Sequence, residues 1–296
     1  MNAAAQKVEH SVIKSLLAWY NQHGRHDLPW RKTRDPYKVL VSELMLQQTQ
    51  VPRVIPKYEA FVKKFPTIAA LAAADRQEVL TLWQGLGYNN RAVRLHALAN
   101  VIARERNGRF PANYDELRAL PGIGPYTAGA VMNFAYNKPA PCVDVNIQRV
   151  LARLFWTPRQ TVDKDALASL ALQLTEESGA AHDWNSALMD FGSAVCTARN
   201  PSCTSCPLRS ACKSKGARND ETNASKRQSA FHGSRRWWRG QILKSLLAAP
   251  VKEAHLLHRI KAQPTAEDHD LYDDALAMML SEGLAERKGQ MLRLRK

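Results

Sequence analysis

Near the middle of the chain the sequence runs Leu120-Pro121-Gly122-Ile123-Gly124-Pro125-Tyr126-Thr127-Ala128-Gly129. This stretch joins two helical patterns through a Gly-x-Gly turn. Gly122 and Gly124 allow backbone conformations that other residues avoid, so successive N–H groups can point outward beside the positive end of the second helix. A turn of this kind, continuing into Thr127, can bind a phosphate without contacting a base. The sequence therefore predicts a helix-hairpin-helix that binds a phosphate backbone; the simpler interpretation is a turn that only reverses the chain.

Helical patterns continue on both sides of this hairpin. From residue 11 to about residue 211 apolar residues recur every three or four positions, and alternating β-branched runs are few. We therefore expect an all-α domain over residues 1–212. Its predicted helices are 12–23, 37–48, 51–65, 76–83, 92–106, 114–119, 126–136, 145–154, 164–176 and 185–195.

The composition indicates an anionic partner. The 296 residues suffice for about two domains, and 42 Lys and Arg against 27 Asp and Glu give a formal net charge of +15. With 45% hydrophobic residues the chain is expected to fold. Its positive charge indicates a polyanionic partner, with nucleic acid a better candidate than an acidic membrane. No apolar stretch approaches the roughly 18 residues of a membrane span, which predicts a soluble, cytoplasmic protein without a membrane partner.

Four of the five cysteines form one compact group. Cys196, Cys203, Cys206 and Cys212 have the spacing Cys-x6-Cys-x2-Cys-x5-Cys, and only Cys142 stands apart. In a reducing compartment such clustering indicates a metal site rather than disulfides. Four thiolates bind either zinc or an iron–sulfur cluster, and the spacing alone does not distinguish between them.

One carboxylate occupies an apolar helical face. Glu43 lies four residues after Val39, three after Leu40 and three before Leu46. Desolvation among these neighbours would raise the pKa of Glu43, so that a proton is available near neutral pH for general acid catalysis. The alternative is a glutamate at a solvated edge or at a helix end.

A second carboxylate precedes a helix. Asp144 comes directly before the helical pattern that begins at Val145, and aspartate is a favoured N-cap. A carboxylate that accepts hydrogen bonds from helix N–H groups stays ionised, so Asp144 could stabilise positive charge on a sugar. One protonated acid and one anion divide the work of cleaving a glycosidic bond.

The last third of the chain has a different composition. Residues 213–240 hold eight basic and two acidic residues among Ser, Asn and Gly, which predicts a basic linker. Three predicted helices follow at 237–247, 252–261 and 271–282, and residues 284–287 and 291–295 form a predicted β-hairpin. We therefore expect a small winged-helix-like α+β domain over residues 241–296.

With these residues assembled, the sequence closely resembles the adenine DNA glycosylases of the MutY type, within the helix-hairpin-helix superfamily of endonuclease III. The resemblance covers residues 18–212. Besides the hairpin, Glu43, Asp144 and the cysteine spacing, it rests on Leu28-Pro29-Trp30-Arg31, Asp35-Pro36-Tyr37, Gln47-Gln48-Thr49-Gln50-Val51, Gly85-Leu86-Gly87-Tyr88, Val143-Asp144-Val145-Asn146 and Arg149-Val150-Leu151.

The resemblance implies a [4Fe-4S] cluster at the four cysteines and a monofunctional glycosylase of base excision repair that removes adenine mispaired with 8-oxoguanine or guanine. In this family Glu43 would protonate N7 of adenine and Asp144 would stabilise the sugar cation, with Tyr126 and Asn146 supporting the site. Gln48 and Tyr88 match positions that enter the duplex where the base is flipped out. The implied partner is mismatched or damaged double-stranded DNA, bound by a monomer associated with the nucleoid.

Several features depart from the family pattern. Asn89 stands where a second aromatic residue is common, Val145 replaces a usual glycine, and the C-terminal region is too short for a Nudix-like domain. Two alternatives remain: a thymine or uracil glycosylase acting on G mismatches, and a non-catalytic lesion-binding protein. The motifs around Gln48 and Tyr88 favour adenine, and the presence of both Glu43 and Asp144 favours an enzyme.

Overall fold

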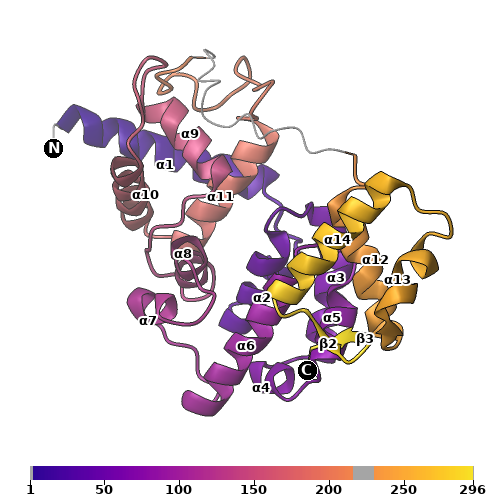
Figure 1. Cartoon of the computed structure of the whole chain (residues 1–296). Coiled ribbons are helices and arrows are strands. Elements are labelled where there is room, and N and C mark those ends of the chain that lie inside the picture. Colours follow the sequence, from indigo (N-terminus) through magenta and orange to yellow (C-terminus); the bar gives the residue numbers. More distant parts are fainter. Residues whose placement is uncertain (1–2, 216–229, 296) are drawn as a thin grey trace. The chain divides into compact units, whose positions relative to one another are not determined.

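The computed structural model describes residues 3–215 and 230–295, and these residues are mostly helical (Figure 1). They divide into two compact units, each built from two separate segments of the chain. The first unit comprises Met1–Glu43 and Phe110–Ser225, and the second comprises Leu44–Arg109 and Lys226–Lys296. The predicted three-part division at residues 212 and 240 stays a prediction.

The first unit packs around one central helix. Its elements are α1 (Ala3–His23), η1 (Pro29–Arg31), most of α2 (Pro36–Leu46), α7 (Tyr114–Arg118), α8 (Pro125–Phe134), α9 (Val145–Phe155), α10 (Lys164–Ser178) and α11 (Ala181–Ala194). Helix α11 contacts α1, α8, α9 and α10. Its fully buried Trp184, Leu188 and Phe191 join apolar side chains of α1, α9 and α10 in one core.

A buried ion pair holds the η1 segment to α11. Asp190 on α11 is 2% exposed, and its Oδ2 accepts a 2.6 Å hydrogen bond from Nη1 of Arg31. Arg25 donates from its backbone N (2.8 Å) and its Nε (2.7 Å) to the same carboxylate. Burial acts to raise the pKa of Asp190, but the hydrogen bonds from Arg31 and Arg25 outweigh it and lower that pKa. This ion pair gives the Leu28–Arg31 motif a structural role.

The second unit begins with five helical segments. They are the last turn of α2, α3 (Val51–Lys64), α4 (Ile68–Ala72), α5 (Arg76–Trp83) and α6 (Asn90–Glu105). Thr67 and Asp75 cap α4 and α5 with their side chains. Phe61 and Trp83 are fully buried and meet edge to face at 5.9 Å between ring centroids. These contacts build a second core.

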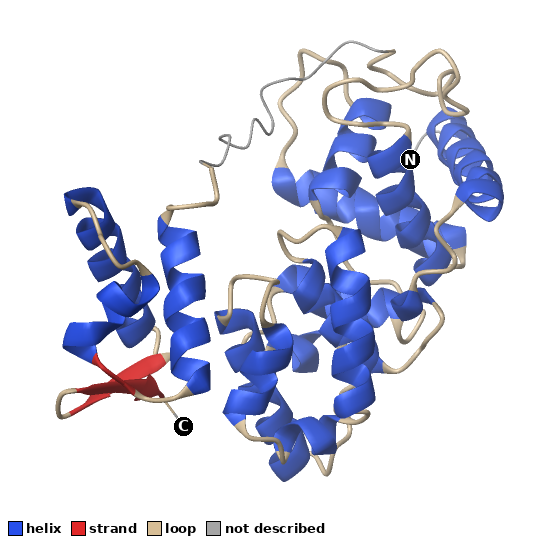
Figure 2. Ribbon diagram, turned by 90° about the vertical axis from the view of Figure 1, so that its right-hand side faces the viewer, coloured by secondary structure: helices blue, strands red, loops and turns tan. Residues whose placement is uncertain are grey.

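The C-terminal part of this unit combines helices with a small sheet (Figure 2). Helices α12 (Arg235–Ala248), α13 (Glu253–Ile260) and α14 (Ala266–Ser281) accompany β1 (Val251–Lys252), β2 (Ala285–Lys288) and β3 (Met291–Leu294). The strands form an antiparallel sheet in the order β1-β3-β2, with Val251 opposite Leu292 and Lys288 opposite Met291. The described residues thus confirm the predicted fold class, an all-α domain followed by a small winged-helix-like α+β region.

Two hydrogen bonds tie the C-terminal helices to α5. Nη2 of Arg76 donates to Gly283 O at 2.7 Å, and Nε2 of Gln77 donates to Leu247 O at 2.8 Å. Both acceptors follow or end a helix, where carbonyl groups lack partners within the helix. The C-terminal region therefore packs against α5 within the second unit.

Some element boundaries differ from the sequence prediction for identifiable reasons. Helix α12 starts at Arg235, because Ser234 caps it by accepting from Trp237 N, so the predicted basic linker ends before Gly240. The linker residues 216–229 lie outside the described residues. Helix α2 ends at Leu46 rather than at residue 48, because Gln48 has a φ of 55° that a right-handed helix cannot accommodate. Three short elements, η1, α4 and β1, were not predicted.

Candidate active site and cysteine loop

The predicted hairpin connects α7 to α8. Gly122 has a φ of 79°, a left-handed conformation that favours glycine, and Gly124 is the N-cap of α8 with Pro125 directly after it. The first-turn N–H groups of α8 have no partner within the helix, which is the feature that the predicted phosphate site needs; phosphate binding there stays a prediction. Thr127 is only 4% exposed, so its hydroxyl does not lie on the surface.

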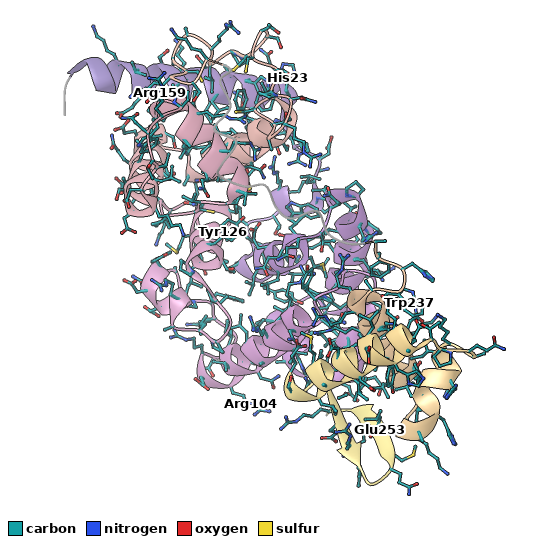
Figure 3. All side chains as sticks on the ribbon, turned by 45° about the horizontal axis from the view of Figure 1, so that its top comes forward. His23, Arg104, Tyr126, Arg159, Trp237 and Glu253 are labelled. Carbon is teal, nitrogen blue, oxygen red and sulfur yellow. The ribbon has the colours of Figure 1, made fainter. Side chains whose placement is uncertain are left out.

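Close packing fixes the start of α8 against the segment that leads to Asp144. A Cβ atom at Gly129 would lie 1.9 Å from Pro141 O, so only glycine permits this approach. The contact places Tyr126, one turn earlier on α8, close to the Asp144 segment; Figure 3 labels Tyr126 on its helix.

Glu43 is buried on α2, with 6% of its surface exposed. The hydroxyl of Tyr126 donates a 2.9 Å hydrogen bond to Oε2 of Glu43. Burial raises the pKa of Glu43 to about 7; the hydrogen bond from Tyr126 and the charge of Arg31 oppose the rise, and the negative charge of Asp144 adds to it. The predicted rise in this pKa is thereby confirmed, and Glu43 exists in both protonation states near neutral pH.

Asp144 caps α9 and is held by several donors. Its Oδ1 accepts from the backbone N–H groups of Asn146 (3.0 Å) and Ile147 (2.7 Å), and its Oδ2 accepts from Nδ2 of Asn146 (2.9 Å). Burial raises the pKa of Asp144 above its ordinary value, and these hydrogen bonds and the charge of Arg149 offset only part of that rise. Because three N–H donors hold Asp144 and a single neutral hydroxyl holds Glu43, the negative charge is better stabilised on Asp144.

Arg149 links this site to the cysteine loop, a connection that the sequence prediction missed. Its Nη2 donates to Oδ1 of Asn146 at 2.9 Å and to Gly192 O at 2.6 Å, and its Nε donates to Cys196 O at 2.8 Å. A Cβ at Gly192 would lie 2.8 Å from Cβ of Asn146, so α9 and α11 approach closely there. The available signal was the spacing: Arg149 follows Asn146 by three positions in one helix, which places both side chains on the same face.

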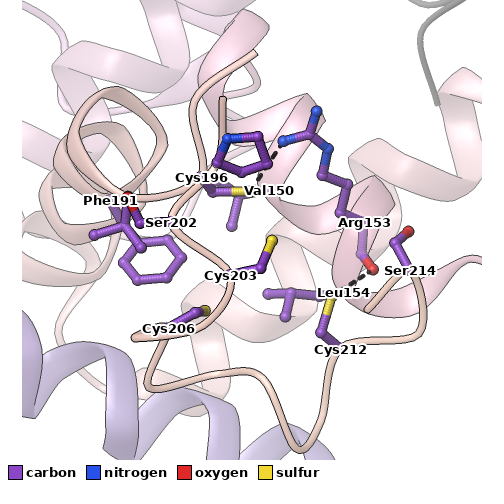
Figure 4. Close-up of a pocket in the computed structure, with 12 residues that line it drawn as sticks. Val150, Arg153, Leu154, Phe191, Cys196, Ser202, Cys203, Cys206, Cys212 and Ser214 are labelled. Atoms are coloured by element: carbon purple, nitrogen blue, oxygen red, sulfur yellow. Dashed lines mark hydrogen bonds between the residues drawn. The ribbon is translucent and has the colours of Figure 1, made fainter. Parts of the chain in front are cut away.

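The four predicted metal ligands line one pocket of the first unit (Figure 4). Cys196, Cys203, Cys206 and Cys212 are free thiols that surround it together with apolar side chains such as Leu154. Burial raises the pKa of the Cys196 and Cys206 thiols, so a bound cation would be needed to hold them as thiolates at neutral pH. The donor set therefore fits a metal centre.

Arg153 connects this loop to α9. Its Nη1 lies 3.5 Å from the Sγ of Cys196 and donates to Thr197 O at 2.8 Å, while its backbone O lies 3.2 Å from the Sγ of Cys212. The guanidinium beside the sulfur atom of Cys196 favours a negative charge on that atom. As placed in residues 3–215 and 230–295, no group of three or more His, Cys, Asp or Glu side chains could hold a metal ion, so the fit to a metal centre rests on the type of donor and not on its geometry.

The other two predicted DNA contacts belong to the second unit. Gln48 and Tyr88 are both exposed, Tyr88 to 44%, and both have positive φ angles, 55° and 47°. Asn89, where a second aromatic residue was expected, is 8% exposed and precedes α6, whereas Val145 is 57% exposed beside Asp144. Val145 therefore presents an apolar side chain to solvent at the first position of α9.

Among the described residues, no helix is both long and apolar enough to cross a membrane.

Comparison with known proteins identifies the family. Residues 41–175 match the model of the HhH-GPD superfamily of base excision DNA repair proteins. An adenine DNA glycosylase of Mycolicibacterium smegmatis is 41% identical over 92% of this chain and 92% of its own length. The human adenine DNA glycosylase is also 41% identical, over 68% of this chain and 39% of the human protein. The mycobacterial match covers 92% of this chain, whereas residues 1–212 make up less than three quarters of it. The match therefore extends into the C-terminal region.

Solved structures agree with this family. A thermostable thymine-DNA glycosylase has a TM-score of 0.67 and 33% identity, covering 72% of this chain and 98% of that one. An endonuclease III in a non-covalent complex with DNA has a TM-score of 0.59 and 25% identity, covering 73% and 97%. The chain therefore belongs to the adenine DNA glycosylase family, within the HhH-GPD superfamily of base excision DNA repair proteins.

Proposed function

We propose that this DNA glycosylase hydrolyses the N-glycosidic bond of adenine mispaired with 8-oxoguanine or guanine. The observation that supports the reaction best is the buried Glu43, which has a pKa of about 7 and lies in the electrostatic field of Asp144. A protonated acid and a nearby anion are the groups that glycosidic bond cleavage needs. The relatives named adenine DNA glycosylase supply the substrate class.

The residues of the site have distinct roles in this reaction. Protonated Glu43 transfers its proton to N7 of the flipped adenine, so that the electron pair of the C1′–N9 bond leaves with the base. Asp144, held by Asn146, stabilises the positive charge that develops on the sugar. Water then adds to C1′ and loses a proton, which gives free adenine and an abasic site.

Tyr126 determines whether strand cleavage accompanies base release. A lysine at this position would supply an amine for a Schiff base and strand cleavage, and a tyrosine has no such amine. Burial raises the pKa of Tyr126 well above its ordinary value, so its hydroxyl stays protonated and donates to Glu43. We therefore expect a monofunctional glycosylase with little strand cleavage.

The four cysteines would hold the cofactor. Four free thiols around one pocket support a [4Fe-4S] cluster, a group that cysteine thiolates hold in proteins. When bound, the cluster supplies a covalent cross-link that orders residues 196–212 against α9 and α11. Broad visible absorption by the purified protein that is lost together with iron would support this cofactor; zinc in its place would refute it.

DNA binding would use the hairpin and two exposed residues, Gln48 and Tyr88. The start of α8, from Gly122 through Gly124 to the N–H of Thr127, would hold a phosphate, and Gln48 and Tyr88 would enter the duplex where the base is extruded. The +15 charge predicts that affinity falls steeply with salt. We propose a monomer, which sedimentation at several protein concentrations would test.

The substrate is tested with a panel of duplexes. Purified protein is incubated with duplexes that hold A:8-oxoG, A:G, T:G or U:G, and alkali then cleaves the abasic sites. Cleavage after release from both adenine mispairs, and little cleavage without alkali, is the expected result. Release from T:G or U:G alone would instead assign the protein to the activity named for its thymine-DNA glycosylase structural relative. Binding without release from any duplex would indicate a non-catalytic lesion-binding protein.

A further inference from the structure

The two residues proposed to enter the duplex have unfavourable backbone conformations. Gln48 follows α2 and Tyr88 precedes α6, and both have φ angles in the left-handed region. A non-glycine residue there costs about 1 to 3 kcal/mol and persists only when surrounding contacts hold it. Both residues are exposed, and the contacts that hold them act mainly on the backbone of the two loops.

The guanidinium of Arg91 supplies these contacts at the end of α2. Arg91 lies in the first turn of α6 and is 7% exposed. Its Nη1 donates to Leu44 O (2.6 Å), Met45 O (3.1 Å) and Gln47 O (2.5 Å). The last carbonyl groups of a helix have no partner within the helix, so Arg91 caps α2 directly before Gln48.

The same guanidinium holds the loop that carries Tyr88. Its Nη2 donates to Leu86 O (3.2 Å) and Gly87 O (2.9 Å), and its Nε donates to Tyr88 O (3.3 Å). The guanidinium carbon also lies 5.5 Å from the centroid of the Tyr88 ring. One side chain therefore contacts the backbone on the N-terminal side of Gln48 and the backbone at Tyr88.

Thr49 forms a second bridge between the same loops. Its Oγ1 accepts from Nη2 of Arg91 at 3.3 Å and lies 3.2 Å from Leu86 O. Burial lowers the pKa of Arg91 only to about 10, so the guanidinium stays charged at neutral pH. Six backbone carbonyl groups compensate for its lost hydration.

We propose that Arg91 is a positioning residue for base extrusion, which holds the loops of Gln48 and Tyr88 together in the conformation that enters the duplex. This inference rests on the proposed function of those two residues. It requires arginine in particular, because a lysine ammonium has three donors on one atom and cannot span both loops, whereas the guanidinium has five in a rigid plane.

Arg91→Lys tests the proposal, with Arg94→Lys as the matched control, since Arg94 lies on the same helix and is exposed. Extrusion is measured as the fluorescence increase of 2-aminopurine placed at the adenine position of an 8-oxoguanine duplex. Adenine release is measured in single turnovers across pH. For Arg91→Lys we expect a reduced fluorescence increase and a rate about tenfold to a hundredfold lower, with Arg94→Lys unchanged.

The pH dependence separates positioning from general loosening. If Arg91 only positions the loops, the fall in rate near pH 7 that reports on Glu43 stays in place and only the amplitude decreases. A shift of that fall, or fluorescence equal to that of Arg94→Lys, would overturn the proposal. Thr49→Val, which leaves Arg91 intact, should show a smaller loss of fluorescence, and no loss in either variant would also overturn it. Wild-type protein that releases no adenine would instead refute the proposed function.

Discussion

Two carboxylates of the first unit are buried to a similar degree, and their pKa values are shifted in opposite directions. Asp190 on α11 is 2% exposed and Glu43 on α2 is 6% exposed. Arg25 and Arg31 bind Asp190 and lower its pKa, whereas Glu43 has the neutral hydroxyl of Tyr126 as its hydrogen-bond donor, and burial raises its pKa to about 7. Burial alone therefore does not make a carboxylate an acid catalyst; the charge of the donor that binds it decides.

The difference also reverses the effect of pH on stability. The pKa of Asp190 is lower in the folded protein, so its contribution to stability is present above the unfolded pKa near 3.9 and is lost as pH falls through the folded value. The pKa of Glu43 is higher in the folded protein, so folding becomes less favourable as pH rises from 4.5 to about 7. At neutral pH Asp190 therefore stabilises the fold, and Glu43 lowers its stability.

The largest expected effect is that of Glu43→Gln on catalysis. The amide cannot transfer a proton, so single-turnover release of adenine should fall at least about a hundredfold, while the affinity for a mismatched duplex stays within a few fold. Glu9→Gln is the matched control, because Glu9 is also buried, on α1, and contacts Gln173 rather than the site. Undiminished release by the Glu43→Gln variant would rule out Glu43 as the acid.

The same substitution should stabilise the fold at alkaline pH. At pH 8 the wild-type protein contains a buried ionised carboxylate that the amide avoids, and a pKa raised from 4.5 to about 7 corresponds to about 3 kcal/mol. Urea unfolding at pH 8 and at pH 4.5 measures the difference, which should be large at the higher pH and small at the lower. Destabilisation of the Glu43→Gln variant at both pH values would contradict the contrast with Asp190.

Asp190→Asn, unlike Glu43→Gln, should destabilise the fold at neutral pH. It leaves the buried Arg31 without its carboxylate, so the free energy of unfolding at pH 7 should fall by about 3 to 5 kcal/mol. Asp27→Asn is the control, since Asp27 pairs with Lys32 in an exposed position and should change stability by less than about 1 kcal/mol. The folded fraction of the Asp190→Asn variant should keep its rate of adenine release; a hundredfold lower rate would mean that Asp190 also belongs to the site.

The pH dependence of catalysis tests whether Glu43 must be protonated. Because Glu43 must be protonated, the single-turnover rate should fall about tenfold per pH unit above about pH 7. Duplex binding measured at each pH separates chemistry from affinity. A rate that rises above pH 7 would show that a deprotonated group drives the reaction, and the assignment of Glu43 as the acid would fail.

The buried carboxylates show which features of a site can be predicted from a sequence and which cannot. The raised pKa of Glu43 was predictable, because apolar residues three and four positions away place it on a buried helix face. The N-cap at Asp144 was predictable from its place before α9. The pairing of Asp190 with Arg31 was not, because its partners lie 159 residues apart in the sequence. The same reason concealed the role of Arg149, whose acceptors on α11 and in the cysteine loop are distant along the chain.

The fold shows the same limits. Helices with capping residues and regular apolar spacing were predictable, as for residues 76–83, which match α5 at both ends. The end of α2 was not, because the left-handed turn at Gln48 depends on Arg91 from α6 rather than on a local glycine. The start of α12 was missed because three arginines in its first turns suggested a solvated linker, although Ser234 is a favourable N-cap.

The smallest expected effect is that of Tyr126→Phe, which removes the donor to Glu43 and leaves the ring. The hydrogen bond favours the ionised carboxylate, so its loss should raise the pKa of Glu43 further and move the fall in rate to higher pH, by about one unit. Tyr136→Phe is the control, because the hydroxyl of Tyr136 donates to Phe110 O and not to Glu43. The rate-against-pH profile of both variants measures the shift. If the fall in rate moved to lower pH in the Tyr126→Phe variant, Tyr126 would be shown to stabilise the protonated acid. The contrast between a carboxylate held by a neutral donor and one held by arginines would then no longer explain the proton on Glu43.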